Sequence, residues 1–101
     1  MFKDLDPLLH SQLRLAIISM LINSEKVEFT YIKEETKAAA GNISIQIKNL
    51  QEAGYIKVEK TFKNNYPKTF VSITDKGVKA FESYVNDLKK YINPKMPISE
   101  Y

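Results

Sequence analysis

The sequence predicts a mainly α-helical domain with one small β-hairpin. Three long segments repeat apolar residues every three or four positions, which is the spacing of an amphipathic helix. Two shorter segments, 55–62 and 69–74, alternate apolar and polar residues as strands do, and a short polar segment separates them. With 101 residues, the chain is expected to form one domain over residues 1–92, followed by a flexible tail over residues 93–101.

The first helix is predicted to begin at Asp6 and Pro7 and to end near Ser24. Aspartate is a favoured N-cap residue, and proline is favoured at the first helical position. The apolar side chains of this helix form two stripes, and a helix with two apolar sides is buried on both. One stripe can serve the domain's core, so we expect the other to contact a second element or a partner chain. This outer stripe consists of Leu8, Leu15, Ile18 and Ile22.

A very short strand over 27–29 is predicted to precede a second helix over 31–37. Thr30 can cap this helix, because its side-chain oxygen can accept a hydrogen bond from the first turn. The segment 38–41 is then expected to be a turn, with Gly41 marking the break before the central helix.

The central helix is predicted over 42–53 and is expected to end at Gly54. Ile43, Ile47 and Leu50 are spaced i, i+4, i+7, so they share one face. The opposite face and its flanks are small, polar and singly basic, which suits a helix that enters a DNA major groove. The residues there are Ser44, Ile45, Lys48, Asn49 and Glu52.

The segment 63–68 between the two strands is predicted to be a polar loop, because asparagine and proline favour turns. Thr74 and Asp75 are expected to cap the last helix, which should run to about Ile92. Its apolar residues have the spacing of a helix that packs against another helix. The full order is α-β-α-α-β-β-α, which is the winged helix-turn-helix arrangement. The apolar and aromatic residues of the last helix are Val78, Phe81, Tyr84, Val85, Leu88, Tyr91 and Ile92.

The net charge of +3 is unevenly distributed along the chain. Residues 37–68 contain six lysines and two glutamates, a balance of +4, whereas the nine basic and ten acidic residues elsewhere give −1. A basic region of this kind attracts phosphate groups. An ordinary lysine-rich surface has the same charge, so charge alone leaves both interpretations open.

The composition excludes several classes of site. The absence of cysteine excludes cysteine-based zinc sites, redox motifs and a thiol nucleophile. The N-terminus lacks the apolar segment of a signal peptide, and the apolar segment 13–22 contains Arg14 and is too short to span a bilayer. His10 is the only histidine, and no catalytic or metal-binding spacing accompanies it. We therefore expect a cytoplasmic protein that is not an enzyme, with no catalytic residues, metal, cofactor or membrane contact.

The ordered elements resemble a known family, the short winged-helix transcriptional regulators of the MarR and ArsR-like group, close to the winged helix DNA-binding domain family. The similarity extends from residue 5 to about residue 92. The chain departs from the family at Ala39 and Ala40, where threonine or serine is usual, and at Gln46, where histidine is usual. The matching motifs are Leu5-Asp6-Pro7-Leu8-Leu9-His10, Leu13-Arg14-Leu15-Ala16-Ile17, Phe29-Thr30, Gly41-Asn42-Ile43-Ser44, Leu50-Gln51-Glu52-Ala53-Gly54-Tyr55-Ile56, Pro67-Lys68-Thr69 and Thr74-Asp75-Lys76-Gly77.

The resemblance implies a DNA-binding regulator that is generally dimeric through its terminal helices. With the polar face of the central helix, it predicts a homodimer that binds a pseudo-palindromic site in double-stranded DNA. The expected dimer contacts are Leu8, Leu15, Ile18, Ile22, Phe81, Tyr84, Val85, Leu88, Tyr91 and Ile92. The expected DNA contacts are Thr30, Tyr31, Asn42, Ser44, Ile45, Lys48, Asn49, Lys63, Asn64, Asn65 and Lys68. The alternative is a protein–protein interaction module on the same fold, because a fold does not decide function.

Overall fold

A computed structural model describes residues 2–92 of the chain, which contain four helices and a three-stranded antiparallel sheet. The element order confirms the winged helix-turn-helix arrangement, and the predicted flexible tail over 93–101 lies outside the described residues. The elements are α1 (Gln12–Leu21), β1 (Val27–Glu28), α2 (Phe29–Thr36), α3 (Ala40–Glu52), β2 (Ile56–Lys63), β3 (Tyr66–Ile73) and α4 (Asp75–Ile92).

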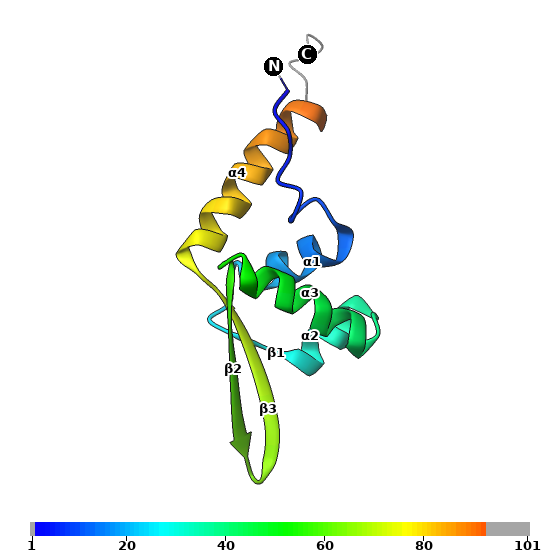
Figure 1. Cartoon of the computed structure of the whole chain (residues 1–101), viewed down its shortest axis with the longest axis vertical. Coiled ribbons are helices and arrows are strands. Elements are labelled where there is room, and N and C mark those ends of the chain that lie inside the picture. The colour runs from blue at the N-terminus through cyan, green and yellow to red at the C-terminus, as the bar shows by residue number, and fades with distance from the viewer. Residues whose placement is uncertain (1, 93–101) are drawn as a thin grey trace.

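The three helices α1, α2 and α3 form a body from which two elements project in opposite directions (Figure 1). The β2–β3 hairpin, which is the wing, extends from one end, and α4 extends from the other. The strand order β1-β3-β2 makes β3 the central strand. Val71 pairs with Val27 on one side and with Val58 on the other, so the short β1 ties the base of the wing to the body.

The core lies where the three helices meet the base of the sheet. Ile43 and Leu50 of α3 are fully buried and Ile47 nearly so, which confirms the predicted inward face of the central helix. Burying each such side chain contributes about 1.5–3 kcal/mol to folding. The largest fully buried side chains are Leu9, Ile17, Ile18, Leu21, Ile32, Ile43, Leu50 and Val71.

The first helix begins later than predicted, at Gln12 instead of Asp6 and Pro7. Asp6 does cap a structure, because its Oδ1 accepts a hydrogen bond from the backbone N–H of Leu8 over 2.9 Å. That structure is an isolated turn, after which the backbone is extended at Ser11. The helix also ends at Leu21, before the expected Ser24.

The starts of the next two helices differ from the prediction as well. The α2 helix begins at Phe29, directly after β1, so Thr30 lies within its first turn and Glu28 occupies the N-cap position. The turn before α3 is made by Lys37, whose φ of 57° is left-handed, while Gly41 lies inside the helix. The end of α3 is as predicted, because Gly54 has a φ of 82°.

The tip of the wing is a two-residue turn and not the six-residue loop predicted over 63–68. Asn64 and Asn65 have φ values of 53° and 68°, as both central residues of a type I′ hairpin turn require. Asparagine tolerates this conformation better than most residues. The pairing of Lys63 with Tyr66 therefore continues the ladder to the turn, and Pro67 and Lys68 belong to β3.

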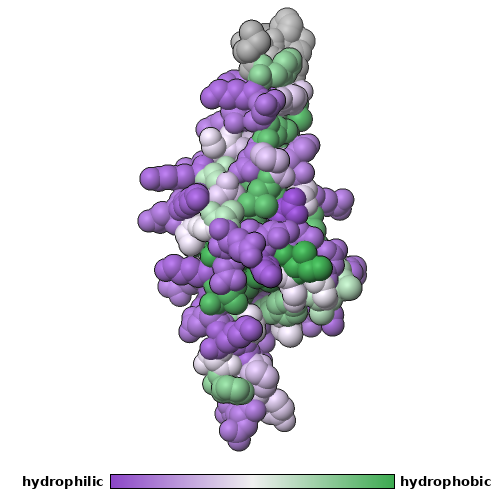
Figure 2. Space-filling view, viewed as in Figure 1, coloured by the Kyte–Doolittle hydropathy of each residue, from purple (hydrophilic) through white to green (hydrophobic). Residues whose placement is uncertain are grey.

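The α4 helix has the predicted bounds, and the N-terminal segment runs alongside it (Figure 1). The Tyr91 hydroxyl donates a hydrogen bond to the carbonyl of Lys3 over 2.6 Å, and the rings of Phe2 and Tyr91 are 4.8 Å apart. Nearer the body, the Tyr84 hydroxyl is 2.9 Å from Nδ1 of His10. The N-terminal segment thus covers one side of α4, in a region where Figure 2 shows a band of apolar surface.

Two of the residues predicted to contact a dimer partner are buried within the chain itself, so the prediction is wrong for them. Ile18 and Tyr84 are 0% and 3% exposed, and both belong to the chain's own core. They are therefore not available to a partner, because the helix body and the N-terminal segment already cover them. Tyr91 and Ile92, by contrast, are 43% and 70% exposed.

The described residues show neither a membrane span nor a metal cluster. Every helix within 2–92 is too short or too polar to cross a bilayer. Within the same range, no three histidine, aspartate or glutamate side chains gather closely enough to hold a metal ion.

Candidate nucleic-acid interface

The α3 helix presents a buried face, an outer face and a face toward the wing. Ile45 lies on the outer face and is 59% exposed, and Lys48 and Glu52 are exposed beside it. Ser44, Lys48 and Gln51 are spaced i, i+4, i+7 and line the side of α3 that faces the wing. The helix thus carries a polar surface that continues toward the hairpin.

A groove of about 360 Å³ separates α3 from the wing. Its apolar residues come from three elements. They are Phe29 from α2, Ile47 from α3 and Val58 from β2. Its polar side chains come from α3 and from the hairpin. The full lining is Phe29, Ser44, Ile47, Lys48, Gln51, Val58, Lys60 and Thr69.

Lys60 is a candidate site residue that the sequence prediction missed. It pairs with Thr69 across the hairpin and lines the groove together with Lys48 of α3. The alternation of β2 carried the signal, because Lys60 continues the row of Ile56 and Val58, which points toward α3. Where that row leaves the core, a lysine replaces an apolar residue and places a charge beside α3.

The wing lysines differ in their surroundings. Lys68 projects from the face of the sheet opposite to Lys60, where its Nζ is 3.1 Å from a carboxylate oxygen of Glu28. This ion pair partly neutralises Lys68, which the sequence placed in the DNA contact. Within residues 2–92, neither Lys60 nor Lys63 forms an ion pair.

The remaining predicted wing residues lie at the hairpin tip. Lys63, Asn64 and Asn65 are all exposed there, at the end of the wing farthest from the helix body (Figure 1). They therefore lie beyond Lys60, which lines the groove halfway along β2 together with Lys48 of α3.

The first turns of α2 and α3 have no side-chain cap. Glu28 precedes α2 without bonding to it, and Ala39 precedes α3 with no polar group to offer. The first backbone N–H groups of a helix have no partner within the helix. Thr30 and Tyr31 are exposed in the first turn of α2, as Asn42 is in that of α3. Both helix starts therefore offer donors and a positive dipole end to an anion.

A chain of hydrogen bonds fixes α3 against α1. Nη1 of Arg14 donates to Oε1 of Gln46 over 2.5 Å, and Nε of Arg14 donates to the carbonyl of Leu8 over 2.6 Å. Nε2 of Gln46 in turn donates to Oδ1 of Asn42 over 2.9 Å. Asn42 therefore uses its carboxamide oxygen within the protein. Arg14 and Gln46 are 32 residues apart, and no local sequence signal indicated their contact.

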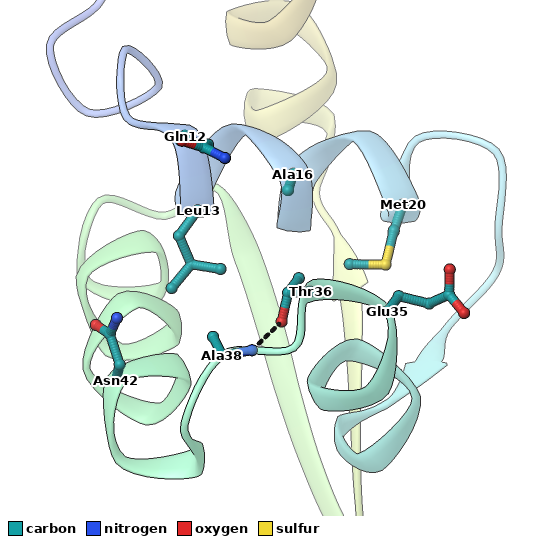
Figure 3. Close-up of a pocket in the computed structure, with 8 residues that line it drawn as sticks. All are labelled: Gln12, Leu13, Ala16, Met20, Glu35, Thr36, Ala38 and Asn42. Carbon is teal, nitrogen blue, oxygen red and sulfur yellow. Dashed lines mark hydrogen bonds between the residues drawn. The ribbon is translucent and has the colours of Figure 1, made fainter.

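A second pocket, of about 540 Å³, lies between α1 and the turn that joins α2 to α3 (Figure 3). The turn beside it is held by Thr36, whose Oγ1 accepts a hydrogen bond from the N–H of Ala38 over 3.3 Å and donates one to the carbonyl of Ile32 over 2.8 Å. The lining residues are Gln12, Leu13, Ala16, Met20, Glu35, Thr36, Ala38 and Asn42.

Tyr55 joins the end of α3 to the N-terminal segment. Its hydroxyl donates a hydrogen bond to Oδ2 of Asp6 over 2.6 Å. Burial raises the pKa of Tyr55 from 10.0 to about 12, and the hydrogen bond to Asp6 and the charge of that carboxylate add to the shift. The carboxylate of Asp6 thus holds both this tyrosine and the turn at Leu8.

Comparisons with known proteins agree with this architecture. A solved structure of a transcriptional regulator homologue from Pyrococcus horikoshii OT3 is 29% identical to the chain, with a TM-score of 0.80 and 86% of each chain covered. Diamide-treated YodB from B. subtilis has a TM-score of 0.76 over 90% of this chain and 89% of its own, and at 16% identity it shows the fold alone.

Sequence comparison gives the family directly. An uncharacterised protein of Methanocaldococcus jannaschii is 33% identical over 79 residues, which are 78% of this chain and 86% of that protein. The family model of the winged helix DNA-binding domain matches residues 13–92. This match confirms the predicted resemblance and indicates a DNA-binding protein instead of an enzyme. The chain belongs to the winged helix DNA-binding domain family.

Proposed function

We propose that the protein is a transcriptional regulator that binds specific sites in double-stranded DNA as a homodimer. The observation that carries the proposal is that polar side chains of α3 (Ser44, Lys48 and Gln51) and of the wing (Lys60 and Thr69) line one groove. The similar protein from Pyrococcus horikoshii is described as a transcriptional regulator homologue, which supports the same role here.

In this proposal α3 lies in the major groove and reads base edges. Ser44, Lys48 and Asn49 supply hydrogen-bonding groups, and each can discriminate among the donor and acceptor patterns of the base pairs. The exposed side chain of Ile45 suits apolar contact with a thymine methyl group. Asn42 keeps its amide N–H₂ for DNA, since its carboxamide oxygen already accepts from Gln46.

Phosphate contacts would position the protein without reading sequence. The uncapped first turn of α2, at Thr30 and Tyr31, supplies backbone donors. Lys60 supplies charge at the groove, and Lys63 supplies it at the tip, where Asn64 and Asn65 add hydrogen-bonding groups. Lys68 would contribute less to phosphate binding, because Glu28 already neutralises some of its charge.

Dimerisation is proposed through α4, which projects from the helix body (Figure 1). A projecting amphipathic helix needs a partner to bury its apolar stripe. In a symmetric dimer the two α3 helices would lie about 34 Å apart, one turn of DNA, so the site would be a pseudo-palindrome. The residues with surface available for this interface are Leu8, Leu15, Ile22, Phe81, Val85, Leu88, Tyr91 and Ile92.

A protein-interaction module is the second candidate, and one observation favours it. The outer face of α3 has a single lysine, Lys48, opposed by Glu52, and it exposes the apolar Ile45. Such a face is less basic than phosphate contact alone requires, so the wing and the helix starts would have to supply much of the affinity for DNA.

Selection from a pool of random duplex DNA at two salt concentrations, with the oligomeric state measured in parallel, tests the proposal. Enrichment of an inverted repeat by a dimer is the expected result. Weak binding that is blind to sequence and disappears at moderate salt would contradict it and favour the protein-interaction module, because sequence-independent affinity comes from phosphate contacts alone.

A further inference from the structure

The end of the wing carries exposed apolar side chains that nothing in the described residues covers. Phe62 is 75% exposed and Tyr66 is 70% exposed, and Pro67 is also exposed. Figure 2 shows apolar surface among the hydrophilic side chains near this end of the molecule. A ligand that covers Phe62 removes apolar surface from water and gains affinity.

The hairpin register places these side chains on two different faces. Phe62 pairs with Pro67, in the same alternating row as Lys60, so both project toward the side on which α3 lies. Tyr66 pairs with Lys63, and these two project from the opposite face. Phe62 and Pro67 therefore face the space where α3 would hold DNA, whereas Tyr66 faces away from it.

The ladder holds Phe62 in place. Strand pairing continues without interruption past Phe62 and Pro67 to Lys63 and Tyr66, and the turn has only two residues. The backbone of such a hairpin is already fixed, so binding costs less backbone entropy than it would for a residue on a flexible loop.

The residue types on the wing indicate how it would contact DNA. Arg14 is the only arginine in the sequence, and its side chain is bonded to Gln46 and Leu8 within the body. The wing therefore lacks the residue that most often reads a narrow minor groove by charge. Phenylalanine and proline are residue types that insert as apolar wedges from the minor groove. Lys60 lies two residues before Phe62 in the same row of β2, so it can supply charge for a phosphate beside the wedge.

We propose that Phe62, supported by Pro67, is an apolar wedge that inserts from the wing into the DNA minor groove and bends the duplex. The wedge rests on the proposed function, because it requires that α3 bind DNA. It adds a bend that depends on how easily a base step opens, so the wing would favour flexible pyrimidine–purine steps at its contact site.

The test uses Phe62→Ala in the full-length protein, with Tyr66→Ala as the matched control on the opposite face. On a duplex selected by the wild type, fluorescence energy transfer between labelled DNA ends measures the bend, and titration at several salt concentrations measures affinity. We expect Phe62→Ala to reduce the bend and to weaken binding by about tenfold or more. The slope of log affinity against log salt should not change, because no charge is removed.

The controls separate a wedge from a general effect. Tyr66→Ala should retain the wild-type bend and affinity, and Phe62→Leu should restore most of both, since leucine also acts as a wedge. Sedimentation of the Phe62→Ala protein without DNA should match that of the wild type. Thermal unfolding should also be unchanged, because the side chain is exposed.

Three results would overturn the wedge alone. Equal bending by the wild type and Phe62→Ala would show that Phe62 does not deform DNA, and the proposed regulator function would still stand. Equal losses in Phe62→Ala and Tyr66→Ala would indicate a general effect on the tip. A dimer lost in Phe62→Ala would assign the patch to a second copy of the chain. Failure of the wild type to bind any duplex would instead reject the proposed function and the wedge together.

Discussion

Nη1 of Arg14 donates a hydrogen bond to Oε1 of Gln46 over 2.5 Å, and this contact joins α1 to the middle of α3. The same guanidinium donates to the carbonyl of Leu8, so one side chain of α1 links α3 to the N-terminal turn. Because Gln46 also donates to Asn42, the position of a proposed base-contacting residue depends on Arg14.

Replacing Arg14 by alanine is expected to lower the free energy of unfolding by about 1–3 kcal/mol, because Gln46 and the Leu8 carbonyl lose their donor. DNA affinity should fall further than global unfolding explains, since α3 is less well positioned. Urea unfolding and duplex titration measure the two effects. Lys79→Ala, at an exposed position of α4, is the control for loss of a surface cation. Wild-type stability in Arg14→Ala would contradict the structural role.

Tyr55→Phe tests the contact between Tyr55 and Asp6. The pKa of Tyr55 in the folded protein is about 12, above its ordinary value of 10.0, so the folded state keeps the proton longer than the unfolded state does. The contact's contribution is therefore complete below pH 10 and is lost as the pH rises toward 12. Near pH 8 we expect Tyr55→Phe to be less stable than the wild type by about 1 kcal/mol.

The difference in unfolding free energy between the wild type and Tyr55→Phe should shrink from pH 10 to 12. Comparing the two proteins at each pH cancels the titration of lysines and the other tyrosines. Urea titrations at pH 8, 10 and 11 give this difference. A difference that stays constant with pH would mean that Tyr55 does not titrate with a raised pKa.

Salt-dependent DNA titrations of single lysine variants test the wing. Lys60→Ala and Lys63→Ala should each weaken binding to all duplexes and reduce the salt slope by about 1. Lys68→Ala should have a smaller effect, because Glu28 already pairs with Lys68. Equal slopes for the three variants would indicate that the ion pair opens in the complex. No change in any of them at low salt would reject the wing as a DNA contact.

Gly77→Ala tests the junction between the sheet and α4. A Cβ at Gly77 would lie 2.2 Å from the carbonyl oxygen of Tyr55 and 2.8 Å from Cγ1 of Ile73, so the backbone would have to shift. We expect a loss of about 1–3 kcal/mol in thermal or urea unfolding. Gly41→Ala is the matched control, since a Cβ there meets nothing within 4 Å and alanine favours the helix. Similar stabilities for the two variants would contradict the close packing at Gly77.

The elements that the sequence predicted best are those with strong local signals. The regular spacing of apolar residues predicted the bounds of α4. Gly54, which has a left-handed backbone conformation, marked the end of α3. Local signals misled where a tertiary contact competed with them. Asp6 and Pro7 form a good helix start, but Asp6 caps only a turn and also binds Tyr55.

The start of α3 and the tip of the wing were predicted less well for a different reason. Ala39 and Gly41 have no side chain that could fix a boundary, so the helix begins where Lys37 turns the backbone. At the wing, Pro67 suggested a loop, but two asparagines form the tight turn and Pro67 fits into β3.

For the candidate site, the sequence pattern predicted which residues lie on the outer face of α3, but it did not predict the contacts that hold α3 and the wing in position. Lys60 could have been found from the alternation of β2, because it falls in the inward row. The contact between Arg14 and Gln46 could not, because the two residues are far apart in sequence and neither lies in a motif that pairs them. The ion pair of Lys68 with Glu28 likewise depends on β1 pairing beside β3.

The measurement that tests the central claim most directly is the affinity of Asn49→Ala for the selected duplex and for a scrambled duplex of equal composition. If α3 reads bases in the major groove, Asn49→Ala should lose about 1–3 kcal/mol of discrimination and keep its affinity for the scrambled duplex. Lys63→Ala, the comparison variant, should weaken both duplexes equally. An equal loss on both duplexes in Asn49→Ala, or no loss on either, would contradict sequence reading by this helix.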